Sequence, residues 1–207
     1  MKRFVSILII LAVWAGPLSG EGPYETESRL PDTLDVVNGI TWNNATNACT
    51  EDDSEADSTN FGVAGTYAGG NFANITQVPA ADGVLTAFAV RHREINNEHA
   101  NDTYLLQVYN PDTTVWETLE TFNSANLLPD VLTTEDYTSA MATKYAAASN
   151  KTTFLNGLQF RLYCSVKTGG ADGINWALAW AKFTYEYEES AVAPPPEWVV
   201  ESEVILP

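Results

Sequence analysis

The feature that most constrains the fold of this chain is a regular alternation of apolar and polar side chains along residues 158–166. Its apolar members are separated by single polar residues and comprise Leu158, Phe160, Leu162, Cys164 and Val166. Because successive side chains of a β-strand point to opposite faces, this pattern gives one apolar and one polar face. The segment is therefore predicted to be a half-buried strand of an antiparallel sheet.

The same signal recurs along the chain with turn residues between the segments. Residues 85–94 alternate in a similar way. Residues 104–109 and 115–122 flank Asn-Pro-Asp-Thr-Thr, which is a strong turn sequence, so these two segments are predicted to form a hairpin. A glycine-rich stretch at 169–173 separates two further predicted strands in the same manner.

Helix signals are sparse. The best covers residues 134–148, with Thr133 or Thr134 as the N-cap and Glu135 and Asp136 in the first turn. Many short strands and one helix are typical of an all-β protein. We therefore predict an antiparallel β-sandwich or jelly roll with one short crossover helix.

The N-terminal residues are typical of an export signal. Lys2 and Arg3 precede an apolar run at 4–15, and small residues follow. This order predicts a secretory signal peptide over residues 1–20 and a secreted or cell-surface protein, and the alternative is a retained membrane anchor. After removal of the signal we expect no membrane association.

The rest of the chain is predicted to have three parts. Residues 21–37 are expected to be an extended polar segment, and residues 38–189 to be the β-sandwich domain. Residues 190–207 contain three consecutive prolines followed by an apolar, β-branched stretch, which predicts a stiff spacer and one more strand. That strand must pair either with its own sheet or with a neighbouring copy, because a free apolar strand is an aggregation hazard.

The charge balance excludes some classes of partner. The chain has 27 acidic and 10 basic residues, with a net charge of −17. Binding to nucleic acid or to anionic membranes depends on Lys and Arg, so we expect neither partner.

One stretch of sequence resembles a known family. A Trp-Asn-Asn-Ala-Thr-Asn-Ala run at 42–48 precedes an acidic turn at 51–57, and a hairpin with Val-Tyr and Trp-x-x-Leu follows at 108–119. Over residues 38–188 the chain resembles secreted galactose-binding-like jelly-roll modules of surface and carbohydrate-binding proteins. The resemblance implies fold and compartment more than function. The chain departs from the family pattern at Cys49 and in its tryptophan-rich segment 174–180.

Cysteines and sequons fit an exported protein. Cys49 and Cys164 are the only two cysteines, and in an oxidising compartment they are predicted to form one disulfide; two buried free thiols are the alternative. Four Asn-x-Thr sequons predict N-glycosylation, at Asn44, Asn74, Asn101 and Asn150.

The acidic turn is a candidate calcium site. It contains Asp52, Asp53 and Asp57 at close spacing, and carboxylate oxygens are preferred calcium ligands. The alternative is a solvated acidic loop, and no other cofactor is expected. His92 and His99 flank two glutamates, but we expect a capped hairpin there rather than a metal site.

Tryptophans near the C-terminus are candidate interface or ligand residues. Trp176 and Trp180 share one parity of a strand whose two faces are both apolar, and Trp198 lies in the predicted last strand. Either one row belongs to the core, or the row is a sugar-stacking platform or a subunit interface.

These observations favour a binding or building role over catalysis. No nucleophile motif of the Gly-x-Ser-x-Gly type is present, so the chain is not expected to be an enzyme. We expect an extracellular structural or cell-surface glycoprotein that assembles with copies of itself through its terminal strands. The alternative is a carbohydrate-binding or adhesive module with a calcium-stabilised loop, whose partners are glycans.

Overall fold

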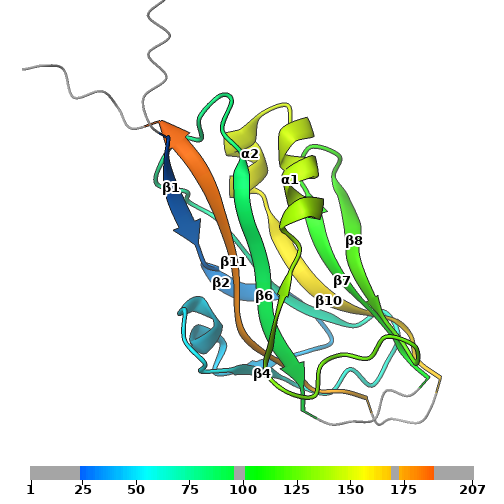
Figure 1. Ribbon diagram of the computed structural model, residues 1–207. Helices are drawn as coiled ribbons and strands as arrows, with labels where there is room; N and C mark the ends of the chain where they lie inside the picture. Colours follow the sequence, from blue (N-terminus) through cyan, green and yellow to red (C-terminus); the bar gives the residue numbers. More distant parts are fainter. Residues whose placement is uncertain (1–23, 96–100, 169–172, 189–207) are drawn as a thin grey trace, which may run out of the picture.

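The computed structural model describes residues 24–95, 101–168 and 173–188. The chain folds into two antiparallel sheets packed face to face (Figure 1), with six strands in one and five in the other. This confirms the predicted all-β sandwich. The strands are β1 Tyr24–Arg29, β2 Thr33–Asn38, β3 Trp42–Asn43, β4 Ala56–Ser58, β5 Tyr67–Asn71, β6 Leu85–Glu94, β7 Thr103–Asn110, β8 Val115–Phe122, β9 Thr133–Asp136, β10 Gln159–Val166 and β11 Trp176–Glu188. The helices are the 3-10 helix η1 Ala45–Cys49 and the α-helices α1 Thr138–Ala147 and α2 Lys151–Asn156.

Strand order differs from sequence order in both sheets. The six-stranded sheet runs β3-β4-β11-β6-β9, and β1 also pairs with β11. The five-stranded sheet runs β2-β5-β10-β7-β8. The predicted hairpin is confirmed, since β7 and β8 pair from Tyr104 with Phe122 to Asn110 with Val115.

The N-terminal segment takes part in both sheets. Residues 21–37 were expected to be extended, and the described part of this segment forms β1 and most of β2. β1 pairs with the C-terminal half of β11, while β2 pairs with β5 in the other sheet. The segment is therefore joined to the sandwich of its own chain, and β1 is not free to add to a neighbour's sheet.

The helix prediction is correct at its end and wrong at its start. Thr133 to Asp136 form strand β9 beside β6, because the β-branched threonines suit a sheet edge. The helix begins at Thr138. Asp136 Oδ1 accepts hydrogen bonds from the backbone N and Oγ1 of Thr138, at 2.9 and 2.5 Å. A second helix, α2, follows, and its N-cap is Asn150.

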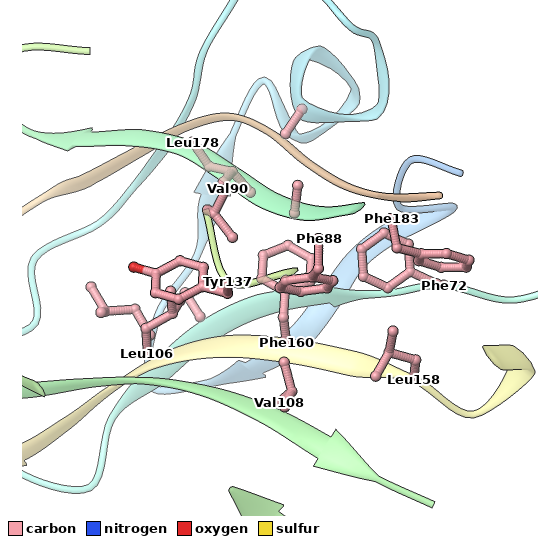
Figure 2. Packing of buried hydrophobic residues seen from close by; sticks show 14 of the residues in the cluster. Phe72, Phe88, Val90, Leu106, Val108, Tyr137, Leu158, Phe160, Leu178 and Phe183 are labelled. Carbon is pink, nitrogen blue, oxygen red and sulfur yellow. The ribbon is translucent and has the colours of Figure 1, made fainter. Parts of the chain in front are cut away.

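The core lies between the two sheets and is rich in aromatic side chains (Figure 2). Phe72, which directly follows β5, contacts Phe183 and Phe160, with ring centroids 4.9 and 5.6 Å from its own. Phe88 and Val90 of β6 are fully buried on the inner face, as their strand parity predicts. Phe160 and Leu162 of β10 are buried opposite them. Among the described residues, no helix is long and apolar enough to cross a membrane.

A bulge in β11 reverses the direction of its side chains. Leu178 pairs with His92 and Trp180 pairs with Arg91, so Ala179 is an extra residue without a partner on β6. Before the bulge, Trp176 and Leu178 face the core; after it, Ala181 and Phe183 do. The bulge explains why alternate side chains of both sets are apolar around residues 176–181. One set faces the core before the bulge, and the other set faces it after the bulge.

Candidate functional site

The four sequon asparagines are all exposed. Asn44 and Asn74 occupy left-handed backbone positions, each with φ of 56°. Asn150 caps α2 through its side-chain oxygen, which accepts from the backbone N of Thr153 at 2.9 Å. Its amide nitrogen is thus left for a glycan. The geometry is compatible with glycosylation, which stays a prediction.

The predicted disulfide between Cys49 and Cys164 is wrong, because both residues are free thiols. Cys164 faces the core from β10, whereas Cys49 ends helix η1, which packs against β11, β2 and β4. The two cysteines therefore belong to different parts of the sandwich. Burial raises the pKa of the Cys49 thiol and raises that of Cys164 to about 11, so both are held protonated at neutral pH.

The acidic loop, residues 51–57, is held by cations of the six-stranded sheet. Asp53 accepts from Arg91 Nε at 2.7 Å, and this hydrogen bond holds the pKa of Asp53 below its usual value. Glu55 forms a bidentate pair with Arg93, with both N–O distances 2.7 Å. These contacts bind the loop to the outer face of β6.

The structure does not gather the candidate calcium ligands into one site. Asp52 Oδ1 accepts from the backbone N of Ser54 at 2.8 Å, and Asp53 is engaged with Arg91. Asp57 lies in β4, where burial and then the charge of Glu55 raise its pKa. Among the described residues no group of three or more His, Cys, Asp or Glu side chains is arranged to hold a metal ion. Arg91, Arg93 and Lys182, which pairs with Glu51, supply the positive charge beside this loop.

The two tryptophans of β11 lie on opposite sides of the sheet. Trp176 is fully buried and belongs to the core, so its predicted role as an interface or ligand residue is wrong. Trp180 is half-buried on the outer face, with the Lys182 ammonium 5.4 Å from its ring centroid. The bulge at Ala179 separates them. Trp198 and His99 lie outside the described residues.

Trp176 ends a buried chain of hydrogen bonds. Its indole N–H donates to His92 Nδ1 at 2.9 Å, so the imidazole proton lies on Nε2 and is donated to Glu135 at 2.7 Å. Tyr137 lies 2.6 Å from the same Glu135 oxygen and 2.5 Å from Glu120. Burial acts to raise the pKa of Glu135, but the hydrogen bonds outweigh it and hold that pKa below its usual value. His92 is thus a satisfied core residue and not a metal ligand.

A different cluster, on the outer face of the five-stranded sheet, is the strongest candidate for a binding site. Strand parity places its side chains away from the core on β5, β7, β8 and β10. Five of its six side chains are half-buried, and the glutamine is buried. We call this cluster the aromatic face, and it comprises Tyr67, Gln107, Tyr109, Trp116, Arg161 and Tyr163.

Arg161 is the centre of the aromatic face. Its Cζ lies 3.9 Å from the ring centroid of Trp116, 4.5 Å from that of Tyr67 and 4.8 Å from that of Tyr163. Its Nε donates to Gln107 Oε1 at 2.9 Å. Burial lowers the pKa of Arg161, and the group stays a cation at any physiological pH.

The hairpin completes the cluster, because Tyr109 pairs directly with Trp116 across β7 and β8 and their ring centroids are 5.5 Å apart. The tyrosine hydroxyls of the aromatic face make no hydrogen bond within the described part of the chain. Half-buried rings beside unused polar groups can bind a ligand that is apolar on one side and polar at its periphery.

Sequence reasoning missed this site, although the signals were present. The polar row of β10 includes Arg161 and Tyr163, and the two rings that flank the Asn-Pro-Asp-Thr-Thr turn are an aromatic cross-strand pair. The strand order that brings β5, β10, β7 and β8 side by side could not be deduced from either signal.

Comparison with models of known protein families finds no family that matches this chain, and comparison with curated proteins finds no matching relative. The β-sandwich architecture is shown, and a family is not.

Proposed function

We propose that this chain is an extracellular or cell-surface protein that acts, without catalysis, as a carbohydrate-binding or adhesive module. The single observation that carries the proposal is the aromatic face. Sugar rings bury their C–H groups against aromatic side chains and place their hydroxyl groups on neighbouring polar side chains. The aromatic face combines four half-buried rings with a guanidinium and an amide.

Two further features support this proposal. The resemblance to galactose-binding-like jelly rolls implies a carbohydrate-binding context, and the four exposed sequon asparagines fit a chain that passes through a secretory route. The net charge of −17 disfavours nucleic acid and anionic lipid as alternative ligands. Calcium is no part of the proposal, because the acidic loop is paired with protein cations.

The experiment compares two half-buried tryptophans on the two outer faces of the sandwich. The intact protein, Trp116→Ala and Trp180→Ala are tested for binding to a panel of immobilised polysaccharides. Loss of the Trp116 ring should weaken binding about tenfold, because an aromatic contact is removed. Trp180→Ala should bind as the unaltered protein does. Equal loss in both variants, or retention by Trp116→Ala, would overturn the assignment to the aromatic face.

A self-assembling structural subunit is the second candidate function, and one observation favours it. β8 ends the five-stranded sheet and pairs only with β7 within the described residues, so its outer edge has no partner strand there. The predicted strand in residues 190–207 of a neighbouring copy would be the partner. Deleting residues 191–207 should then abolish polymers in size-exclusion chromatography and leave the melting temperature near its original value.

A further inference from the structure

Arg161 differs from nearly all other cations of the described chain in its lack of an acidic partner. Six of the eight described lysines and arginines lie within 4.0 Å of a carboxylate; these are Arg29, Arg91, Arg93, Lys144, Lys167 and Lys182. The ammonium group of Lys151 lies 4.4 Å from the ring centroid of Tyr145. The chain has 27 acidic residues, yet among the residues that the structure describes Arg161 is the cation that combines a half-buried position in a cluster of rings with no ion pair to an acid.

Arg161 is also fixed in position. Three rings surround its guanidinium, and the hydrogen bond from Nε to Gln107 sets its orientation. Gln107 is itself held, since its Nε2 donates to Thr118 Oγ1 at 3.3 Å. The terminal N–H groups of Arg161 make no hydrogen bond to any described residue. A guanidinium in this state keeps a planar pair of donors for a bidentate carboxylate.

The surroundings indicate what carries that carboxylate. The hydroxyls of Tyr67, Tyr109 and Tyr163 make no hydrogen bond to the described residues, so polar groups lie around the Arg161 cation. In a sugar acid, hydroxyl groups lie around the carboxylate in the same way. A second copy of this chain is a poor occupant, because two molecules with a net charge of −17 repel each other. A densely charged polyanion is disfavoured for the same reason, whereas one isolated carboxylate is matched by one arginine.

We propose that the aromatic face binds a neutral glycan chain carrying isolated uronic acid residues, with the uronate carboxylate on the terminal N–H groups of Arg161. The sugar ring rests against the aromatic side chains, and its hydroxyls bond to the tyrosine hydroxyls. This inference rests on the proposed carbohydrate-binding function and adds the chemical class of the ligand.

The test uses one oligosaccharide in two forms. A xylan oligosaccharide bearing a single glucuronic acid is compared with the same molecule after reduction of its carboxyl group to an alcohol. Calorimetry with the unaltered protein should give binding about tenfold or more tighter for the acid, because a charge-assisted bidentate hydrogen bond is lost on reduction. This comparison needs no variant and so cannot fail through misfolding.

Variants then assign the preference to one residue. Arg161→Gln should bind the two forms equally, and Arg161→Lys should keep only part of the preference, since it retains the charge without the planar donors. Arg91→Gln removes the same charge from the opposite face and should keep the full preference. The melting temperature of each variant reports its folding.

Three results would overturn the inference, and they are distinguishable from one another. Equal binding of both forms by the unaltered protein would contradict the uronic acid as the ligand class and would leave the proposed carbohydrate-binding function in place. Binding of neither form, with no other polysaccharide of the panel bound, would contradict both the ligand class and the carbohydrate-binding function. Retention of the preference in Arg161→Gln would place the carboxylate elsewhere.

Discussion

The two outer faces of the sandwich use arginine in opposite ways. On the six-stranded sheet, Arg91 and Arg93 of β6 are each paired with a carboxylate of the acidic loop, and the loop is bound down by those pairs. On the five-stranded sheet, Arg161 of β10 points outward and meets rings instead of acids. On the first face both arginines are paired with carboxylates, and on the second Arg161 has no carboxylate partner among the described residues. This difference is the reason for proposing the five-stranded face as the ligand-binding face.

The largest expected effect on stability is the difference between a tryptophan of the core and a tryptophan of the aromatic face. Trp176→Ala should lower the free energy of unfolding by about 3–5 kcal/mol, because it opens a cavity in the core and removes the donor to His92. Trp116→Ala should lower it by about 1 kcal/mol or less, because that ring is half-buried. Urea denaturation of both variants checks this. Equal losses would mean that Trp116 is a structural residue.

A second prediction concerns the inner side of β6, the strand that supplies Arg91 and Arg93 to the outer face. Burial, and then the charge of Asp130, raises the pKa of Glu94 to about 7. The folded state therefore retains this proton where the unfolded chain, with a pKa near 4.5, has lost it. The contribution of Glu94 to the free energy of unfolding is therefore fully present below pH 4.5 and is lost as the pH rises to about 7. The loss is about 3 kcal/mol at most.

The measurement is the free energy of unfolding by urea at several pH values. The Glu94→Gln variant should lose this fall between pH 4.5 and 7, and Glu55→Gln, on the loop, should keep it. A slope that is unchanged in Glu94→Gln would show that another group causes it.

These effects show where prediction from sequence was sufficient and where it was not. Alternation predicted β6 and β10, and the turn sequence between residues 109 and 115 predicted the β7–β8 hairpin, because each of these is a local pattern. The bulge at Ala179 has no local signal, since both parities of β11 are apolar there. It places Trp176 and Trp180, which share a parity, on opposite sides of the sheet. The start of α1 was placed too early because Glu135 and Asp136 suit a helix start as well as a strand end.

The candidate site depended on long-range contacts that a local pattern does not contain. Asp53 meets Arg91 across 38 positions of sequence, so the acidic loop was interpreted as a metal site without knowledge of its partners. The aromatic face needs four strands in a particular order. The disulfide was predicted from compartment and cysteine number, and neither reports which side of the sandwich a cysteine occupies.

A third prediction concerns an ion pair on the outer face of the six-stranded sheet. The Glu55–Arg93 pair is partly exposed, with side-chain exposures of 17 and 36%, so it should contribute about 1 kcal/mol or less. A double-mutant cycle with Glu55→Gln and Arg93→Gln gives this coupling energy. It should shrink at high salt. A coupling near zero at low salt would mean that the loop is held by other contacts.

The smallest expected effect concerns the thiols. Because Cys49 and Cys164 are unpaired, adding a reductant should leave the melting temperature unchanged. Thiol labelling of the unfolded, unreduced protein should modify both cysteines. Absence of labelling together with a lower melting temperature under reduction would restore the disulfide.

The face around Arg161 is proposed to bind the ligand, and the face around the acidic loop is not. Fluorine NMR of the protein labelled with 5-fluorotryptophan, titrated with the glucuronic acid oligosaccharide, reports both faces and the core together. The Trp116 signal should shift on addition of the sugar, while the Trp180 and Trp176 signals stay in place. A shift of the Trp180 signal with Trp116 unmoved would contradict the account.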